Sequence, residues 1–253
     1  MSEQPVIVER DSEISVITIN RPERRNALNS TAATALRAAI QETSDSRVTI
    51  ITGAGDAFCA GGDLDELERW SDLSPEEIGG MLYDSFQGMV RAVRAANAVV
   101  IAAINGAAVG AGLDLALACD MRVASEGAKL GQVWVRLGVI PGTGGAWLTQ
   151  ALAGSGRAAE LLLTGDLISA EDALAAGLVN RVVAGESLMD EARALAARVI
   201  RNPREGVIAN KRAIVVATEQ ALEAALVHAR EVQPERFTSD EFRNAVKAAR
   251  RPS

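Results

Sequence analysis

Apolar residues in the first 183 positions alternate between short runs and longer stretches with helical spacing. Arg47–Thr52 and Ala98–Ile104 are apolar runs of strand length, and Val6–Glu9 with Ser15–Asn20 has the pattern of a β-hairpin. Strands that alternate with helices along a chain need crossover connections between them. The pattern therefore predicts an α/β fold built on a largely parallel sheet.

The chain from Glu186 onward has helical periodicity only. We therefore divide the sequence into a core of residues 1–185 and a helical C-terminal region of residues 186–253. Alanine and leucine occupy more than one face of the later helices, which predicts that this region packs on something beyond its own domain. The expected helices are Glu186–Arg201, Pro203 to about Ala217, Glu219–Val232 and Ser239–Arg250.

The stretch Asn105–Asp120 is the centre of the expected site. It follows the buried strand 98–104, turns at Asn105–Gly106 and continues as a helix of alanines and leucines up to Cys119. A glycine-rich turn that enters a helix leaves backbone N–H groups unpaired, and the helix dipole adds positive potential there. Asp114 lies in the first turn of this helix. One short stretch thus offers a backbone donor and a carboxylate to the same ligand.

A second glycine-rich loop, Gly53–Leu64, follows the strand 47–52 in the same way. Its Ala60-Gly61-Gly62 and the Gly110-Ala111-Gly112 of the other loop can place two N–H groups on one oxygen, the geometry that stabilises an enolate or a thioester oxyanion. Tight βα turns without a ligand are the plainer interpretation. The first loop lacks the GK[ST] ending of a phosphate-binding loop, and the second lacks the third glycine of a dinucleotide fingerprint.

Composition narrows the possible partners of the 253-residue chain. Hydrophobic residues make up 48% and aromatic residues only 3%, so the core must consist of Ala, Leu, Val and Ile. The net charge of −7 argues against a nucleic-acid partner, although a local basic pocket for an anionic ligand remains possible. Cys59 and Cys119 are the only cysteines, and no CxxC or Cys/His cluster is present, which argues against a disulfide scaffold and a structural zinc site. No signal pattern or membrane-spanning run is present, so we expect a cytoplasmic protein with no membrane partner.

Four segments, in order, carry a resemblance to a known family. They are RPERRNALN, ITGAGDAFCAGGDLDEL, IAAINGAAVGAGLDLALACDMRVAS and KLGQVWVRLGVIPGTGGAWL. Together they resemble the successive signatures of the crotonase (enoyl-CoA hydratase/isomerase) superfamily over nearly the whole chain. The resemblance implies a crotonase-like spiral of ββα units, a helical C-terminal trimerisation region and an acyl-CoA thioester substrate. It also implies a homotrimer or a dimer of trimers, with no cofactor beyond the coenzyme A of the substrate.

The resemblance assigns binding roles position by position. The oxyanion donors would be the N–H groups of Gly62 and Ala111. The family usually has glycine at the second position; alanine keeps the N–H but would add strain of roughly 1–2 kcal/mol if the position needs a positive φ. The nucleotide of coenzyme A would be held by Arg24, Arg25 and Ala27, and its adenine and pantetheine arm by Ala60, Gly61, Gly62, Asp63 and Leu64. Solvated loop charge is the alternative interpretation of the two arginines.

Hydratases of this family use two glutamates, and both positions differ here. The first falls at Asp114, a shorter but chemically competent acid, whose alternative role is to stabilise the helix dipole alone. The second falls at Trp134, which could stack, exclude water, donate its indole N–H or simply pack in the core. Dehalogenases that act on 4-chlorobenzoyl-CoA resemble the chain in having this tryptophan. Their nucleophilic aspartate would fall at Gly142, so that reaction is not supported.

A single carboxylate limits the chemistry. General acid–base catalysis is typically worth about 10²–10⁴-fold, so hydration should be weak unless a second group takes part. Asp65, Glu66 and Asp72, on a possible lid, could supply that second acid. His228, the only histidine, is expected to be an ordinary helical residue, because no serine has the nucleophile-elbow pattern of a hydrolase.

The sequence therefore predicts an acyl-CoA enzyme of the enoyl-CoA hydratase/isomerase type. Gly62 and Ala111 would stabilise a thioester enolate, Asp114 would act as acid/base, and Trp134 would shape the acyl pocket. Double-bond isomerisation or a specialised lyase reaction is favoured over ordinary short-chain hydration, and hydrolysis or retro-Claisen cleavage would also suit one carboxylate. The competing hypothesis is a non-catalytic acyl-CoA-binding protein that has lost the second acid.

Overall fold

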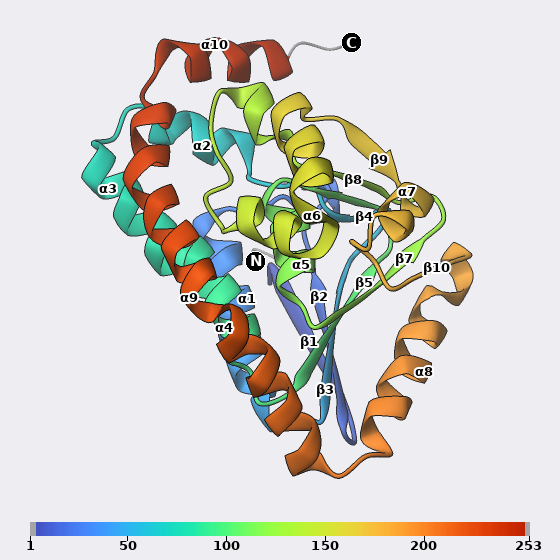
Figure 1. The fold of residues 1–253 in the computed structure, drawn as a ribbon. Coiled ribbons are helices and arrows are strands. Elements are labelled where there is room, and N and C mark those ends of the chain that lie inside the picture. The colour runs from blue at the N-terminus through green and yellow to red at the C-terminus, as the bar shows by residue number, and fades with distance from the viewer. Residues whose placement is uncertain (1–3, 251–253) are drawn as a thin grey trace.

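The computed structural model describes residues 4–250, and its backbone is organised around two β-sheets (Figure 1). The larger sheet has six strands in the order β1-β2-β3-β5-β7-β10. Its first pair is antiparallel and each later pair is parallel, as the alternation of strands and helices predicts. The strands are β1 (Val6–Asp11), β2 (Ile14–Ile19), β3 (Val48–Gly53), β5 (Val99–Ile104), β7 (Met121–Ser125) and β10 (Arg181–Val183).

Polar side chains begin the core helices close to the expected positions. Asn29 caps the first helix, Ser74 and Glu77 form a capping box, and Ser169 forms another with Asp172. The core helices are α1 (Ser30–Glu42), α2 (Leu64–Trp70), α3 (Pro75–Met81), α4 (Gly88–Ala95), α5 (Ala111–Ala118), α6 (Gly145–Thr164) and α7 (Ala170–Ala175), and a π-helical segment, Leu82–Gln87, joins α3 to α4.

Both faces of the six-stranded sheet are covered. On one face Val16 and Ile50 pack against α8 (Leu188–Ile200). On the other face their neighbours Ile17 and Ile51 join the main core with α1, α4 and α5. Successive strand residues point to opposite faces, so a strand buried on both sides has no polar positions. This arrangement explains why β3 and β5 have nearly uninterrupted apolar sequences.

A smaller, four-stranded sheet in the order β4-β6-β8-β9 lies beside the larger one. Its strands are β4 (Ala57–Cys59), β6 (Ala107–Val109), β8 (Lys129–Gly131) and β9 (Leu167–Ser169). The elements follow one another as β3-β4-α2, β5-β6-α5 and β7-β8-α6, which repeats a strand–strand–helix unit. The sequence analysis did not predict β4, β6 or β9, because strands of three residues are too short to show alternation.

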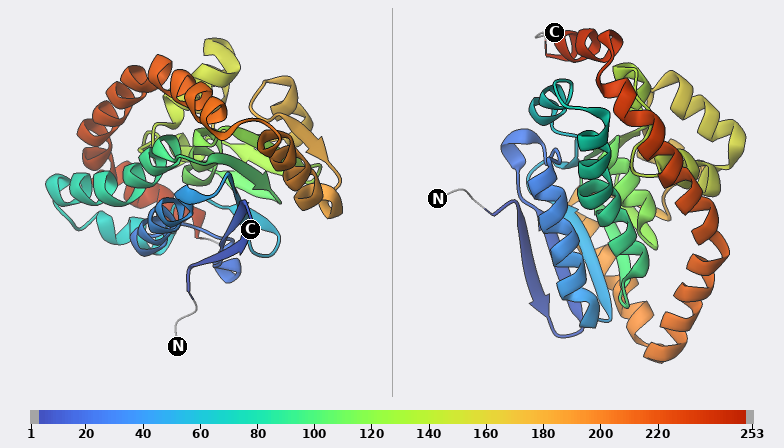
Figure 2. Two further views of the ribbon diagram at one scale, coloured as in Figure 1. Left: turned by 90° about the horizontal axis from the view of Figure 1, so that it is seen from below. Right: turned by 90° about the vertical axis from the view of Figure 1, so that its left-hand side faces the viewer.

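The C-terminal region consists of α8, α9 (Arg204–Phe237) and α10 (Asp240–Ala249). The expected break between Ala217 and Glu219 is wrong, because α9 continues through Thr218 as one helix of 34 residues. The Thr218 hydroxyl donates to the carbonyl of Ile214 one turn earlier, at 3.1 Å, so this polar residue fits inside the helix. Figure 2 shows α9 running along the outside of the core helices.

The inner face of α9 packs on the core of residues 1–185, which lies beyond the helical C-terminal region itself. Leu222, Leu226 and Phe237 are buried in the main core. The outer face still carries apolar side chains, since Ile214 is 64% exposed and Val216 is 69% exposed. Some of the apolar residues of α9 are therefore buried against the core, and others remain exposed on its outer face.

The outermost residues of the two predicted regions, 1–3 and 251–253, lie outside the described residues. Across positions 4–250, none of the helices is both long enough and apolar enough to cross a membrane.

Candidate active site

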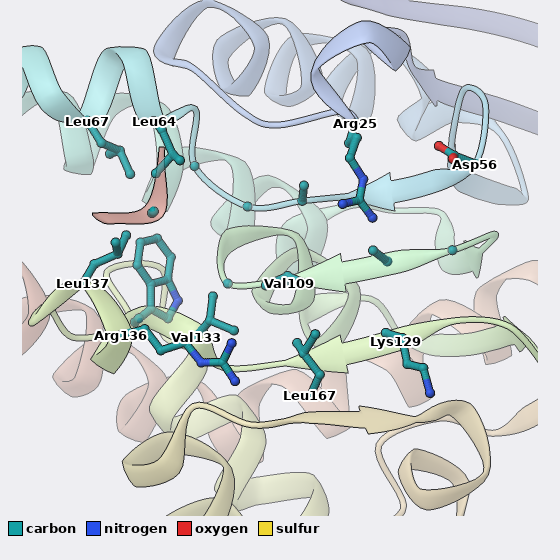
Figure 3. Close-up of a pocket in the computed structure, with 18 of the residues that line it drawn as sticks. Arg25, Asp56, Leu64, Leu67, Val109, Lys129, Val133, Arg136, Leu137 and Leu167 are labelled. Atoms are coloured by element: carbon teal, nitrogen blue, oxygen red, sulfur yellow. The ribbon is translucent and has the colours of Figure 1, made fainter. Parts of the chain in front are cut away.

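A cavity of about 690 Å³ lies over the four-stranded sheet (Figure 3). Each strand contributes to its lining: Ala60 follows β4, Val109 ends β6, Lys129 begins β8 and Leu167 begins β9. The short strands that sequence analysis missed are thus the elements that position the cavity.

The two ends of the cavity differ in character. Leu64, Leu67 and Leu137 lie toward one end of the view in Figure 3. Arg25 and Asp56 lie toward the other end. An apolar end and a polar end suit a ligand with an apolar tail and a charged or polar remainder.

The two predicted glycine-rich loops meet at the cavity wall. Gly62 lines the cavity from one loop and Gly110 from the other. A Cβ atom on Gly61 would lie 2.9 Å from the carbonyl oxygen of Val109 and 3.9 Å from the backbone nitrogen of Ala111. Gly61 also has a φ of +103°, so glycine is the residue that permits this close approach.

The proposed oxyanion donors are free of protein acceptors. Within residues 4–250, neither the N–H of Gly62 nor that of Ala111 donates a hydrogen bond. Ala111 is the first residue of α5, where a backbone N–H has no intrahelical partner. The positive φ of the turn, 54°, belongs to Gly110 and not to Ala111. Alanine at this position therefore keeps the N–H without left-handed strain.

Asp114 is completely buried and firmly held. Its Oδ1 accepts a hydrogen bond from Nε2 of Gln132 at 2.8 Å, and its Oδ2 accepts one from the hydroxyl of Thr143. A Cβ atom on Gly145 would lie 1.9 Å from Oδ1, so the carboxylate rests directly against the first residue of α6. Asp114 therefore lies in the first turn of α5 and also at the start of α6. Both helix dipoles favour negative charge there.

Burial raises the pKa of Asp114 from its ordinary value of 3.8 to about 6. The hydrogen bonds from Thr143 and Gln132, and the indole N–H of Trp134, act in the opposite direction and are outweighed. A carboxyl group with a pKa near neutrality can both accept and donate a proton at physiological pH. Asp114 is not itself a lining residue of the cavity; Gly110, four residues earlier, and Trp134 are.

Trp134 forms part of the cavity wall and is 6% exposed. Its ring packs against Gly110, where a Cβ atom would lie 3.4 Å from Cε2 and 3.7 Å from Nε1 of the indole. The indole N–H lowers the pKa of Asp114, yet Nε1 is buried without a hydrogen bond of ordinary geometry to any described residue. Trp134 is therefore part of the site and not only of the core.

None of the three acids on the predicted lid lines the cavity, and only Asp65 lines the groove beside it. Asp65 is paired with arginines on both sides, and Glu66 accepts hydrogen bonds from the first residue of α1. Asp72 is exposed beside α10. The carboxyl group that does line the cavity is Asp56, at the polar end, and no sequence pattern marked it.

A groove of about 550 Å³ adjoins the cavity and brings together the residues predicted to bind coenzyme A. Its lining includes Arg24, Arg25, Ala27, Ala60, Gly62, Asp63 and Leu64, while Gly61 lines the cavity next to it. Four of these residues, Arg25, Ala60, Gly62 and Leu64, line both spaces, so the groove and the cavity form one continuous site. Ala249 of α10 also borders both.

Asp63 and Arg25 have different environments within this groove. The buried Asp63 accepts hydrogen bonds from Arg21 at 2.8 Å and Arg24 at 3.1 Å. Burial alone would raise the pKa of Asp63, but these hydrogen bonds prevail and the pKa is lowered. Arg25 is exposed and makes no ion pair within the described part of the chain. Arg25 is thus the arginine available to an anionic ligand, while Asp63 holds the loop.

Sequence reasoning missed the residues that hold Asp114. Gln132, Thr143 and Gly145 all lie inside the segment KLGQVWVRLGVIPGTGGAWL, but neither charge nor periodicity marks them. Gly142 in the same segment has no room for a side chain, because its Cβ would lie 1.8 Å from Oε1 of Gln233. His228 is exposed on α9. Among residues 4–250, no group of three or more His, Cys, Asp or Glu is arranged to hold a metal ion.

Comparisons with known proteins agree with this geometry. Residues 9–252 match the model of a family described as enoyl-CoA hydratase/isomerase. The chain is 36% identical over 247 residues to a short-chain-enoyl-CoA hydratase of Clostridium acetobutylicum, which covers 96% of this chain and 93% of the relative. It is 41% identical over 210 residues to a probable enoyl-CoA hydratase of Mycobacterium tuberculosis, covering 82% of this chain and 80% of the relative.

Solved structures show the same architecture. The crystal structure of an enoyl-CoA hydratase/isomerase from Mycobacterium paratuberculosis superposes with a TM-score of 0.90 at 31% sequence identity. The superposition covers 97% of this chain and 98% of that one. The predicted crotonase-like fold is therefore confirmed along nearly the whole chain.

Proposed function

The chain belongs to the enoyl-CoA hydratase/isomerase family, and on this premise we propose that it is an acyl-CoA enzyme that stabilises a thioester enolate. The coenzyme A part of the substrate would occupy the groove beside Arg24 and Arg25. The acyl group would enter the cavity toward Trp134. No cofactor beyond this coenzyme A is required by the proposed chemistry.

The observation that carries the proposal is the pair of unpaired N–H groups at Gly62 and Ala111. They lie on two loops so close that a Cβ atom on Gly61 would lie 3.9 Å from the nitrogen of Ala111. A thioester oxygen gains negative charge when the carbon next to the carbonyl loses a proton. Two donors fixed by the backbone stabilise that charge without reorganisation, and one such donor is typically worth about 10²–10³-fold in rate.

Double-bond isomerisation is the reaction that one carboxylate can complete. Ionised Asp114 would take a proton from C2 of a 3-enoyl-CoA, and the resulting dienolate oxygen would be held by Gly62 and Ala111. The same carboxyl group would return the proton to C4, which moves the double bond from C3–C4 to C2–C3. The pKa of about 6 leaves Asp114 mostly ionised at pH 7, yet basic enough to accept the proton.

One observation favours the alternative of a non-catalytic acyl-CoA-binding protein. Asp114 does not line the cavity, and Trp134 occupies the position of the second hydratase glutamate. A side chain or a water molecule must therefore rearrange before Asp114 can exchange a proton with a substrate. Apo sites often tighten in this way only when the substrate binds.

A turnover screen tests the proposal against this alternative. Saturated, 2-enoyl and 3-enoyl thioesters of several chain lengths are supplied to wild-type protein and to Asp114→Asn. We expect turnover of an enoyl-CoA by wild type and a loss of at least about 10²-fold in the variant. Full turnover by Asp114→Asn would overturn the assigned role. Tight acyl-CoA binding by calorimetry with no turnover of any thioester would support the binding protein.

We also propose that the chain forms a homotrimer or a dimer of trimers. The exposed Ile214 and Val216 on the outer face of α9 support an association surface. Light scattering at micromolar concentration should give three or six times the mass of one chain, and the mass of a monomer would overturn this proposal.

A further inference from the structure

Trp134 and Asp114 form a pair whose role goes beyond the shaping of the acyl pocket. The indole nitrogen is buried, and a buried donor without a partner costs roughly 1–3 kcal/mol. The ring is fixed against Gly110, whose missing side chain leaves just enough room for it. An indole fixed in this way needs a hydrogen-bond acceptor for its buried N–H close to Gly110.

Asp114 lies one helical turn after the glycine against which the indole packs, and its backbone N–H donates to the Gly110 carbonyl at 2.9 Å. Gln132 Nε2 and the Thr143 hydroxyl each donate to one carboxylate oxygen. Each oxygen can accept a further hydrogen bond, so the carboxylate has room for a third donor. The indole N–H of Trp134 is placed to act on the ionised form of Asp114.

We propose that Trp134 is a positioning residue whose indole N–H completes the donor set of Asp114 as the carboxylate ionises. The inference rests on the proposed function for its catalytic consequence, but the interaction itself does not require a substrate. Trp134 stands at the position where hydratases of this family carry a second acid. In this chain it would keep Asp114 ionised and oriented. It supplies a hydrogen bond to the one acid that remains.

The surroundings of Asp114 leave few competing charges. In the part of the chain that the structure describes, no Arg, Lys or His forms an ion pair with this carboxylate. Gln132 and Trp134 approach it from the segment after β8, Thr143 from the turn before α6, and Gly145 from the first position of α6. The buried thiol of Cys59 also interacts with Asp114, and burial raises the pKa of this thiol to about 12, so it stays neutral. The pH dependence near neutrality therefore belongs to Asp114.

Trp134→Phe tests the proposal, because it keeps an aromatic ring and removes the N–H. Loss of a donor to the ionised form must raise the pKa of Asp114. The acid limb of the kcat/KM profile should therefore move to higher pH by about 0.5–1 pH unit. This is the pKa shift expected from the loss of one weak hydrogen bond. Turnover should fall several-fold at pH 6 and little at pH 8.5, with KM nearly unchanged. The matched control is Trp147→Phe, a partly buried tryptophan of α6 that does not line the cavity.

A second measurement needs no turnover. The melting temperature of wild type, Trp134→Phe, Asp114→Asn and the double variant is followed from pH 4 to pH 8. Trp134→Phe should steepen the fall of the melting temperature with pH, and the effect should vanish in the Asp114→Asn background. Equal pH dependence in wild type and Trp134→Phe, by either measurement, would overturn the inference. Absence of turnover together with the expected melting profiles would overturn the proposed function alone.

Discussion

Gly145 and Asp114 are in direct contact at the start of α6, because a Cβ atom on Gly145 would lie 1.9 Å from Oδ1 of the aspartate. Glycine at the first position of α6 is thus a requirement of the acid on α5. The same contact brings the positive end of α6 to the carboxylate, which also receives the hydroxyl of Thr143 from the preceding turn.

Gly145→Ala should displace the Asp114 carboxylate and weaken its hydrogen bonds. We expect kcat to fall about 10–10²-fold with little change in KM, and overpacking to destabilise the fold by roughly 1–3 kcal/mol. Steady-state kinetics and urea unfolding measure the two effects. The control is Gly156→Ala in the same helix, where a new Cβ meets nothing within 4 Å and should be neutral or slightly stabilising. Wild-type kcat in Gly145→Ala would contradict the role of this contact.

Ala111→Pro should remove one oxyanion donor while the helix remains intact. Ala111 is the first residue of α5, a position where proline is well tolerated because its N–H has no intrahelical partner. We expect kcat to fall about 10²–10³-fold, the usual effect of losing one such donor. Ala111→Gly, which keeps the N–H, should retain most activity. The circular dichroism and melting temperature of both variants show whether the fold survives, and equal turnover by a folded Ala111→Pro would contradict an oxyanion role.

Arg25→Gln should weaken binding of the substrate without changing the chemical step. Arg25 is exposed, lines both the groove and the cavity, and is not engaged in an ion pair by residues 4–250. A hydrogen bond to a charged group is worth about 1.5–3 kcal/mol, so KM for acyl-CoA should rise about tenfold or more while kcat stays near wild type. The rise should shrink in high salt. Arg157→Gln on α6, paired with Glu160, is the control and should leave KM unchanged.

Stability should fall as the pH rises through about 6. Burial raises the pKa of Asp114 to about 6 in the folded protein, above the ordinary value of 3.8, so the folded state binds this proton more tightly than the unfolded state does. The stabilisation from the protonated form is complete below about pH 4 and is lost as the pH rises through 6. Asp114→Asn cannot ionise, so its melting temperature should vary less between pH 4 and pH 8. A calorimetric series at several pH values checks this, and parallel curves would contradict it.

The larger sheet and the order of its elements were predictable because their signals extend over many residues. β3 and β5 have long apolar runs, and the capping boxes at Ser74 and Ser169 mark helix starts by local chemistry alone. The four-stranded sheet was not predictable, since β4 and β6 contain three residues each and their pairing depends on the tertiary fold. The expected break between Ala217 and Glu219 is wrong because Thr218 places its hydroxyl on the Ile214 carbonyl and is accommodated within one continuous helix.

The site was predictable only in part. The resemblance and the spacing of glycines place Gly62, Ala111 and Asp114 in one region, and the structure brings the two loops together there. The partners of Asp114 could not be predicted, because Gln132 and Thr143 are common polar residues whose function depends on which group they contact. Nor could sequence show that Trp134 and Gly110, rather than Asp114, line the cavity.

The two buried cysteines, Cys59 and Cys119, can be used to detect local opening of the structure around α5. Cys59 lies under α5, since a Cβ on Gly112 would come within 2.8 Å of its sulfur, and Cys119 lies at the end of the same helix. Burial raises the pKa of both thiols to about 12, so neither presents the reactive thiolate while α5 is in place. The rate at which an alkylating reagent labels either cysteine therefore measures how often α5 separates from the core, and a ligand that binds against the first turn of this helix should slow that labelling.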